Sequence, residues 1–276
     1  MRRETMRDGT LKRWGVFSIV VAIGLVVCAG SASATVVYFD DTFSDTDWDL
    51  TSFVFDGGQN LTTITASQQL AGGNLGAFRK VNHVLAGAFA PGEQSQQLGF
   101  HRNLNAIYDP GVLGAIASLN YSEDAICLDN TQGPACQATS VALIQGGKVY
   151  GANSFLITPD FQWTPKALSG LQQNNFSLVS VSSHTLLDFT QHPDFSATGS
   201  AIDFGFLRAN STCVGCGTGF TFFDSAGIDN WRVSIEQVSQ GDHGGSVIPE
   251  PSSLFLLGSG LFGLAGWRRR RTSRTA

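Results

Sequence analysis

The stretch GIDNWRVSIE at residues 227–236 decides the fold of this 276-residue chain. From Trp231 onward, apolar residues occupy every second position, with Val233 and Ile235 following, and polar residues stand between them. A period of two with one apolar side is typical of a β-strand that covers a core with one face. We therefore predict a strand here, with Trp231, Val233 and Ile235 facing the interior.

The same alternation recurs through the middle of the chain. It is clear around Ile202–Phe206 and around Ala117–Tyr121, and no amphipathic helix of useful length lies between these segments. Further candidate strands are residues 36–39, 53–55, 61–65 and 176–181. Turn clusters rich in Gly, Asn, Asp and Pro stand at 56–58, 72–74, 109–111 and 146–147. The sequence predicts an all-β fold, an antiparallel β-sandwich of the jelly-roll, lectin-like type.

The N-terminal segment is typical of a secretory signal peptide. A basic region precedes the apolar run Val16–Val27, and Ala32-Ser33-Ala34 supplies the small residues of a cleavage site before Thr35. A retained anchor is the first alternative, but the run is about a dozen residues long against the roughly 20 that span a bilayer. A lipoprotein modified at Cys28 is the second, although Val27 is larger than the small residue expected before a lipidated cysteine.

The C-terminal segment has three unlike parts in a fixed order. Pro249, Glu250 and Pro251 come first and interrupt regular structure. An uncharged apolar stretch follows and predicts a short membrane helix at about 252–267. A basic cluster then closes the segment: Arg268, Arg269, Arg270 and Arg271. Basic residues favour the cytoplasmic side, so we expect both ends to start inside and the middle to lie outside.

This C-terminal order resembles the PEP-CTERM sorting signal over about 25 residues. The resemblance implies processing by an exosortase, in Gram-negative bacteria that make exopolysaccharide, after transient anchoring in the inner membrane. The alternative is a plain tail anchor that is never cut. The expected organisation is a signal peptide at 1–34, a β-sandwich domain at 35–243 and a sorting tail at 244–276. Signal peptidase and exosortase are the expected partners, and the cell surface or extracellular matrix is the expected location.

Charge separates the exported part from the two ends. Five of the 17 basic residues lie before residue 14 and five follow Trp267, which leaves seven within residues 35–247, whereas 19 of the 22 acidic residues lie within the same range. The exported domain therefore carries a net charge of about −12. This charge excludes nucleic acid and anionic membrane surfaces as partners, since both require basic patches, and it permits cation binding.

Four cysteines remain after export. An even number in an oxidising compartment predicts disulfides, and the local pairing of Cys127 with Cys136 and Cys213 with Cys216 closes the shortest loops. A zinc or redox site at Cys213-Val-Gly-Cys216 is the alternative. It has no second pair at knuckle spacing and no βαβ context.

Two short motifs resemble the first and last strands of concanavalin-A-like and carbohydrate-binding jelly rolls. They are Phe39-Asp40-Asp41-Thr42-Phe43 followed by Trp48, and the segment Gly227–Val233. The resemblance implies that these strands are neighbours, and that Asp229 stands where such domains often hold a structural calcium. Ca²⁺ requires six to eight hard oxygen ligands, so we expect Asp40, Asp41 and Asp229 to contribute carboxylates. The alternative is a solvated acidic sheet edge.

Sugar binding is the second hypothesis about a site. Trp163 lies in a segment flanked by prolines, and amide side chains follow it closely at 172–175. Tyr108 stands beside Asp109-Pro110 and is the second candidate ring for stacking on a sugar. The alternative is that both rings close the ends of the core.

Enzyme chemistry has little support in the sequence. Glu93, Glu123, Asp124 and Glu236 are candidate acids by residue type only, and the neighbours Glu123 and Asp124 should point to opposite faces of an extended segment. The sequence has no metalloprotease spacing of histidines and no nucleophile elbow. We therefore expect a non-catalytic surface or matrix protein that binds polysaccharide, for which exopolysaccharide is a candidate, or another envelope component. The alternatives are a purely structural or adhesive protein and, less favoured, an extracellular polysaccharide hydrolase.

Overall fold

The computed structural model describes residues 35–130, 136–158, 161–217 and 219–239. The chain divides into two units, Met1–Ser239 and Gln240–Ala276, and the described residues all lie in the first. The predicted signal peptide, sorting motif and membrane helix at 252–267 lie outside the described residues. Within the described ranges, no helix is both long enough and apolar enough to span a bilayer.

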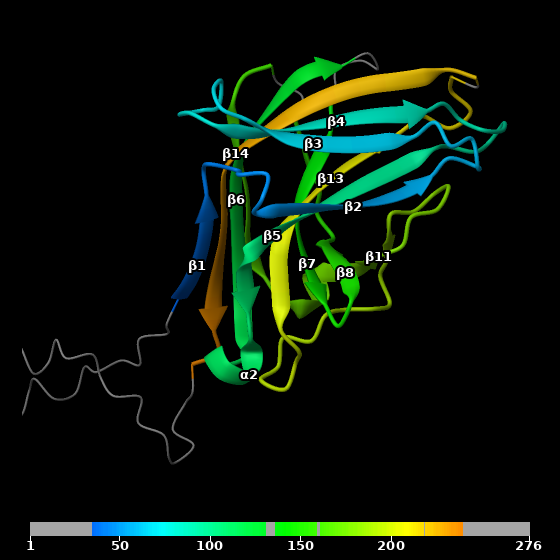
Figure 1. Cartoon of the computed structure of the whole chain (residues 1–276). Helices are drawn as coiled ribbons and strands as arrows, with labels where there is room; N and C mark the ends of the chain where they lie inside the picture. Colours follow the sequence, from blue (N-terminus) through cyan, green and yellow to red (C-terminus); the bar gives the residue numbers. More distant parts are fainter. Residues whose placement is uncertain (1–34, 131–135, 159–160, 218, 240–276) are drawn as a thin grey trace, which may run out of the picture. The chain divides into compact units, whose positions relative to one another are not determined.

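The described residues form two antiparallel sheets, which confirms the predicted β-sandwich (Figure 1). Sheet A has the order β10-β6-β14-β4-β3, with β1 also paired to β14. Its strands are β1 (Thr35–Asp40), β3 (Thr63–Gln69), β4 (Phe78–Ala86), β6 (Ile116–Asn130), β10 (Thr164–Leu171) and β14 (Thr221–Gln237). Sheet B has the order β12-β11-β8-β7-β13-β5-β2, with β9 paired to β7. Its strands are β2 (Trp48–Phe55), β5 (Gln96–Tyr108), β7 (Ala138–Gln145), β8 (Lys148–Ala152), β9 (Leu156–Ile157), β11 (Phe176–Val179), β12 (Leu187–Asp188) and β13 (Ile202–Ser211). The short helices are α2 (Pro110–Leu113) and the 3-10 turn η1 (Gln173–Asn175).

Strand β14 is the centre of sheet A, as its sequence predicts. Trp231, Val233 and Ile235 are fully buried. Strand β6 pairs with β14 along nearly its whole length, whereas the opposite edge is shared by β4 and then by β1. A bulge at Asn230, whose φ is +50°, separates the two partners. Asp40 at the end of β1 pairs with Trp231, so the predicted neighbourhood of first and last strands is confirmed (Figure 1).

Aromatic rings fill the space between the sheets at this point. Trp48 from β2 meets Trp231 edge-on, with ring centroids 5.2 Å apart, and lies 5.3 Å from Phe206 of β13. Phe43 from the β1–β2 loop stacks on Trp48 at 5.4 Å and is completely buried. Burial of large rings contributes much of the hydrophobic stabilisation of a core, at about 25 cal/mol per Å² of apolar surface.

A second part of the interior is unusually polar. Eight polar or charged side chains that are at least nine-tenths buried lie on the strands or, in the case of Gln137, directly before one, and we call them the buried polar layer. They are Arg79, His83, Gln97, His101, Glu123, Gln137, Arg208 and Asp224. The closest charged pair is Arg208 of β13 with Glu123 of β6, with Nη2 and Oε1 3.2 Å apart and both side chains inaccessible to solvent.

Local predictions about turns and cysteines are also confirmed. Gly146 and Gly147 have φ values of +57° and +77° and join β7 to β8 in a two-residue hairpin turn, which glycine adopts without a steric penalty. Cys127 and Cys136 form one disulfide with Cα atoms 5.7 Å apart. Cys213 and Cys216 form the other, with Cα atoms 5.2 Å apart, so the local pairing holds.

Candidate ligand-binding pocket

Asp40 fixes the loop that leaves β1. Its Oδ1 accepts hydrogen bonds from the backbone N–H of Thr42 at 2.8 Å, the Thr42 hydroxyl at 2.8 Å and the backbone N–H of Phe43 at 3.0 Å. Its Oδ2 accepts from the indole Nε1 of Trp48 at 2.7 Å. These four charge-assisted bonds hold the chain in a tight turn, in which Phe43 has a φ of +51° and enters the core.

Strand β5 bows outward opposite this loop. Asp203 of β13 pairs with Ile107, and Gly205 pairs with Arg102, so β5 uses three more residues than β13 over this interval. Residues 103–106, which face the single residue Phe204, form a bulge that leaves the regular sheet. Gly205 allows the close approach, because a side chain there would strike the carbonyl of His101.

The loop and the bulge are joined to each other by backbone and side-chain bonds. Asn103 is the last residue of β5 to pair with β2, opposite Trp48. The next N–H, that of Leu104, donates to the carbonyl of Asp47 at 2.9 Å. On the other side, the Tyr38 hydroxyl donates to the carbonyl of Ile107 at 2.5 Å and links the edge of sheet A to sheet B.

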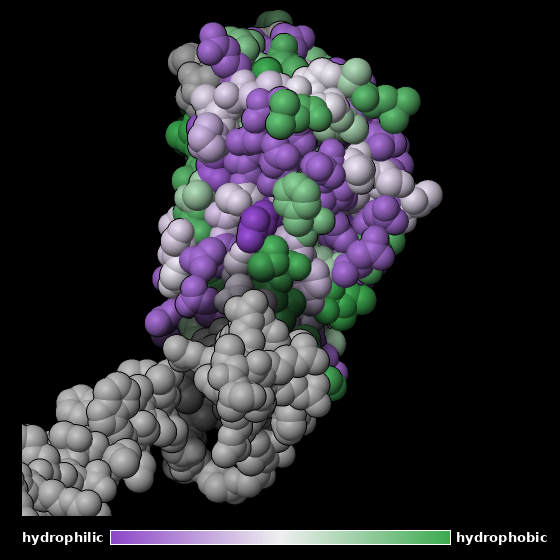
Figure 2. All heavy atoms as spheres, turned by 90° about the vertical axis from the view of Figure 1, so that its left-hand side faces the viewer, coloured by the Kyte–Doolittle hydropathy of each residue, from purple (hydrophilic) through white to green (hydrophobic). Residues whose placement is uncertain are grey.

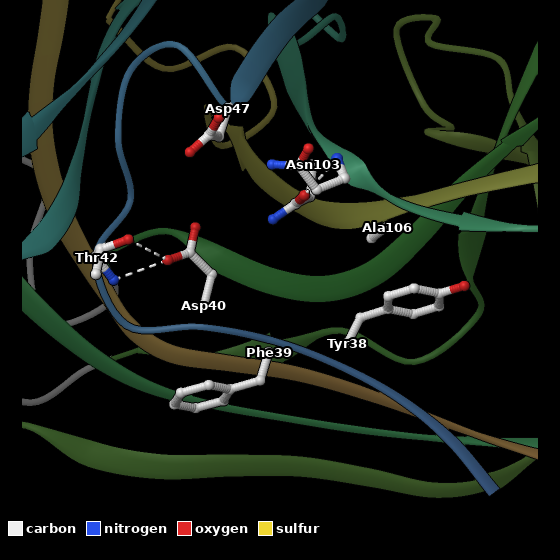
Figure 3. A pocket seen from close by; sticks show the side chains of 8 residues that line it. Tyr38, Phe39, Asp40, Thr42, Asp47, Asn103 and Ala106 are labelled. Atoms are coloured by element: carbon white, nitrogen blue, oxygen red, sulfur yellow. Dashed lines mark hydrogen bonds between the residues drawn. The ribbon is translucent and has the colours of Figure 1, made fainter.

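A cavity of about 200 Å³ lies between these segments, and we call it the β1 pocket. Its lining is Tyr38, Phe39, Asp40, Thr42, Asp47, Asn103, Asn105 and Ala106. In Figure 3 the side chains of Asp40, Asp47 and Asn103 point into the same space, whereas the ring of Phe39 points away from it. The pocket thus combines two carboxylates and two amides, contributed by segments some 60 residues apart in sequence.

Three polar side chains of the β1 pocket keep hydrogen-bonding capacity for a ligand. Asn103 is only 5% exposed; its Oδ1 accepts the Asn105 N–H at 2.9 Å, and its Nδ2 donates to no other described residue. The Asp47 carboxylate and the Asn105 amide likewise have no side-chain partner among the described residues, and Asn105 is exposed. The Nδ2 of Asn103 is not sealed from solvent, so a ligand in the pocket can reach it, and the pocket is suited to a polar ligand.

The surface beside the β1 pocket continues this polar character. Phe39, 53% exposed, and Val37, 42% exposed, stand at the edge of sheet A. Beside them a row of hydroxyl, amide and charged side chains covers the outer face: Ser118, Asn120, Ser122, Arg232, Ser234 and Glu236. Figure 2, viewed from the side on which β1 lies in Figure 1, shows hydrophilic residues gathered in the middle with smaller hydrophobic groups around them.

The three aspartates predicted to bind calcium have separate surroundings. Both carboxylate oxygens of Asp40 accept hydrogen bonds from residues 42–48, and Asp41 is exposed. Asp229, only 2% exposed, accepts from the backbone N–H groups of Asn74 and Asn230, both at 2.7 Å. Across the described ranges, no group of three His, Cys, Asp or Glu side chains is arranged to hold a metal ion. Calcium binding therefore stays a prediction that these contacts do not support.

Of the two predicted sugar-stacking rings, Tyr108 is wrongly assigned. Its side chain is fully buried at the end of β5, and its hydroxyl donates to the carbonyl of Gly114 at 2.8 Å. The adjacent Asp109-Pro110 turn starts α2 and encloses the ring instead of exposing it.

Trp163, whose side chain is half-buried, precedes β10 and lies against sheet A beside Gly227, whereas Tyr108 belongs to sheet B. It packs edge-on against Phe78 at 5.4 Å and donates from Nε1 to the carbonyl of Gly72 at 3.1 Å. These contacts account for one side of the ring. Stacking of a sugar on its remaining surface is still an untested prediction.

The candidate acids do not assemble into a hydrolytic pair. Glu123 is buried with Arg208, whereas its neighbour Asp124 points to the outer face and accepts from Asn74 and Asn230, as the strand period predicts. Glu236 accepts from Ser118 and Asn120 on the outer face.

Glu93 has different neighbours from the other three acids. It accepts from the hydroxyl of Ser183, and the same imidazole nitrogen, Nε2 of His184, faces both Ser183 and Glu93 at 3.4 and 3.6 Å. A catalytic relay needs the histidine to bridge nucleophile and acid through its two different ring nitrogens, so this contact is not a triad.

The pocket residues Asp47, Asn103 and Asn105 were not identified from the sequence. The available signal is weak: in Arg102-Asn103-Leu104-Asn105, polar residues interrupt a strand where apolar alternation would be expected. Only the pairing of β5 with β2 and β13 reveals that this interruption is a bulge facing the β1–β2 loop.

Comparison with solved structures finds resemblances of low sequence identity. The Family 11 carbohydrate-binding module from Clostridium thermocellum, in complex with a β-1,3-1,4-mixed-linked tetrasaccharide, is 12% identical, with a TM-score of 0.39. The comparison covers 76% of this chain and 100% of that one. The CBM22-1 xylan-binding domain from Paenibacillus barcinonensis Xyn10C is 10% identical, with a TM-score of 0.35, over 76% of this chain and 99% of that one. A likeness of this degree says nothing about a ligand of this chain.

No curated protein sequence matches the chain. The C-terminal segment, in contrast, matches a family model described as the PEP-CTERM protein-sorting motif, at residues 247–271. This range contains Pro249, Glu250 and Pro251 and the arginines from Arg268 to Arg271. The chain therefore carries a PEP-CTERM sorting motif, which implies an exported protein that an exosortase-type system sorts.

Proposed function

We propose that this protein acts at the cell surface or in the extracellular matrix, where its β-sandwich binds polysaccharide or another envelope component without chemical turnover. The observation that supports binding most directly is the β1 pocket, in which Asp47, Asn103 and Asn105 offer hydrogen-bonding groups that no other described residue uses. The sorting motif supports the location.

The chemistry of the β1 pocket suits sugar hydroxyls. A hydroxyl donates one hydrogen bond and accepts up to two, so adjacent hydroxyls of a sugar ring pair well with a carboxylate beside an amide. Asp47 supplies the acceptor, and Asn103 and Asn105 supply donors.

The size of the pocket limits what it can hold. At about 200 Å³ it is smaller than the roughly 300–1,000 Å³ typical of drug-sized ligands. One sugar ring at a time is the expected occupant. Useful retention on a polymer would then come from many weak contacts along the chain and between molecules, as in other multivalent binding.

The pocket's own carboxylates argue for binding without hydrolysis. Glycoside hydrolysis needs one carboxyl that donates a proton and a second that acts as base or nucleophile. Asp40 lines the pocket, yet both its oxygens already accept hydrogen bonds, four in total. The Asp40 carboxylate is therefore occupied as an acceptor within its own loop. Among the pocket residues, no other free carboxyl is left to act together with Asp47.

A polysaccharide-binding measurement tests the proposal. The processed protein would be recovered from the cell surface and applied to an array that contains the cell's own exopolysaccharide together with reference polysaccharides. We expect retention that falls at least about fivefold when Asn105→Ala removes an exposed pocket amide, with no release of reducing sugar. A purely structural or adhesive protein would show no polysaccharide retention at all, and steady release of reducing ends would identify a hydrolase.

A further inference from the structure

We infer that the β1 pocket selects uncharged or amine-bearing sugar residues and rejects uronate, sulfated and phosphorylated ones. This inference rests on the proposed function and adds the class of ligand. The inference follows from the charged groups in the pocket lining, which include carboxylates and no basic side chain.

The pocket lining carries negative charge and no positive charge. Asp40 and Asp47 are the charged residues of the lining, and none of its eight residues is basic. The surrounding domain reinforces this potential, because its net charge is about −12. An anionic sugar would have to approach two carboxylates in a partly enclosed space, where like charges repel more strongly than in open water.

Two arginines on neighbouring strands are already paired with acidic residues, whereas Arg232 of β14 has no acidic partner among the described residues and lies on the outer face of sheet A, outside the pocket lining. Arg102, which precedes the bulge, contacts Asp49 at 2.6 Å and Asp203 at 3.3 Å. Arg79 at the start of β4 contacts Asp45 at 3.0 Å, and its side chain is only 4% exposed.

Arg208 is the third arginine near this part of the interior. It is inaccessible to solvent and paired with Glu123. Recognition of carboxylate or sulfate generally uses a free arginine in bidentate geometry, and these three arginines are not free to provide it.

The free hydrogen-bonding groups of Asp47 and Asn103 favour neutral or amine-bearing sugars. The Asp47 carboxylate is an acceptor only, so it requires a hydroxyl or an ammonium donor from the ligand. The Asn103 Nδ2 is a donor only, so it requires an acceptor such as a hydroxyl, a ring oxygen or an N-acetyl carbonyl. Neutral sugars provide both kinds of group, and a protonated amino sugar adds an attractive charge toward Asp47.

The test uses the full-length protein and three sets of polysaccharides: neutral glucans and mannans, amine-bearing chitosan, and anionic alginate, pectate and sulfated glucan. Affinity is measured at 20 mM and 300 mM salt. We expect binding within the neutral and aminated sets, with anionic polymers at least about tenfold weaker at low salt. High salt should narrow that gap, because the Debye length shortens from roughly 20 Å to less than 10 Å.

Asp47→Asn is the decisive variant, with Asp41→Asn as its matched control. Asp41 is exposed, lies in the same loop and is not part of the pocket lining, so both variants remove one negative charge from one loop. We expect Asp47→Asn to weaken binding of aminated polymer about tenfold and to bring the anionic polymers closer to the neutral ones, whereas Asp41→Asn changes either value less than twofold.

Two results would overturn the inference in different ways. Anionic polymers bound as tightly as neutral ones, or equal effects of the two variants, would refute the selectivity while leaving polysaccharide binding in place. Absence of binding to all three sets and to the cell's own exopolysaccharide would instead refute the proposed function itself.

Discussion

Replacing Glu123 with alanine should be among the most destabilising single changes in the domain. Glu123 and Arg208 are both inaccessible to solvent and 3.2 Å apart. Glu123 also accepts hydrogen bonds from the hydroxyls of Tyr121 and Thr139 through its other oxygen. Its removal leaves a buried guanidinium with the carbonyl of Gly227, at 3.2 Å, as its remaining polar contact within the described residues.

The expected cost follows from these contacts. Breaking a buried ion pair by removing one partner typically costs about 3–5 kcal/mol, and each buried hydroxyl that loses its acceptor adds about 1–3 kcal/mol, without strict additivity. We therefore expect Glu123→Ala to lower the free energy of unfolding by at least about 4 kcal/mol. For a domain of this size, that corresponds to a fall in Tm of about 8–16 °C.

Urea denaturation followed by tryptophan fluorescence measures this cost, because Trp48 and Trp231 lie in the core. Glu236→Ala is the matched control: it removes a glutamate from the same sheet, but from the outer face, and should cost less than about 1 kcal/mol. The double variant Glu123→Leu with Arg208→Met should regain most of the lost stability, since a buried pair can often be replaced by apolar residues at little cost. Equal effects of Glu123→Ala and Glu236→Ala would show that Glu123 is not a buried partner of Arg208.

The remaining predictions concern acid, packing and the disulfides. Burial, with a smaller contribution from Arg208, lowers the pKa of His83 to about 3, so the folded state binds fewer protons than the unfolded state between pH 3 and 6.5. His83 should therefore reduce the free energy of unfolding by on the order of 3 kcal/mol as pH falls from 6.5 to 4. In urea titrations across that range, the His83→Gln variant should lose less stability than the native protein. A steeper loss in the variant would contradict this sign; the carboxyl of Asp224, whose pKa burial raises to about 6, acts in the opposite direction in both proteins. Gly227→Ala should cost about 1–3 kcal/mol and shift Trp163 fluorescence, because the added Cβ would lie 2.8 Å from the Trp163 ring; an unchanged spectrum would argue against this packing. Replacing Cys127 and its partner with serines should cost about 2–3 kcal/mol in the same assay, and a cost near zero would show that the closed loop adds no stability.

The strands that could be predicted from the sequence are those whose inner faces are apolar. β14 and β13 show clear alternation, and their buried residues include Trp231 and Phe206. β4 and β5 escaped prediction because their inner faces carry His83, Gln97 and His101, and the usual contrast between an apolar and a polar side is lost. Polar side chains on the inner faces of β4 and β5 therefore remove the alternation that identifies a strand, whereas β6, β13 and β14, which also contribute to the buried polar layer, keep enough apolar positions to show it.

The site was harder to predict than the fold because it depends on pairing between distant segments. The sequence indicates Asp40 as a candidate calcium ligand, but it does not show that both carboxylate oxygens accept hydrogen bonds from nearby residues of the same segment. Tyr108 was expected on the surface because polar turn residues follow it, and its position at the inward end of β5 reverses that expectation. Asp47 and Asn103 line one pocket only because β5 bulges at the point where β2 begins.

The central claim is that this protein works outside the cell after its two ends have served in sorting, and the intact mass of the protein recovered from the cell surface tests it most directly. We predict a mass that lacks residues 1–34 and has also lost a C-terminal portion beginning within the motif at 247–271, together with no free thiols at the four remaining cysteines. A full-length chain of 29.4 kDa found in the cytosol with reduced cysteines would contradict it.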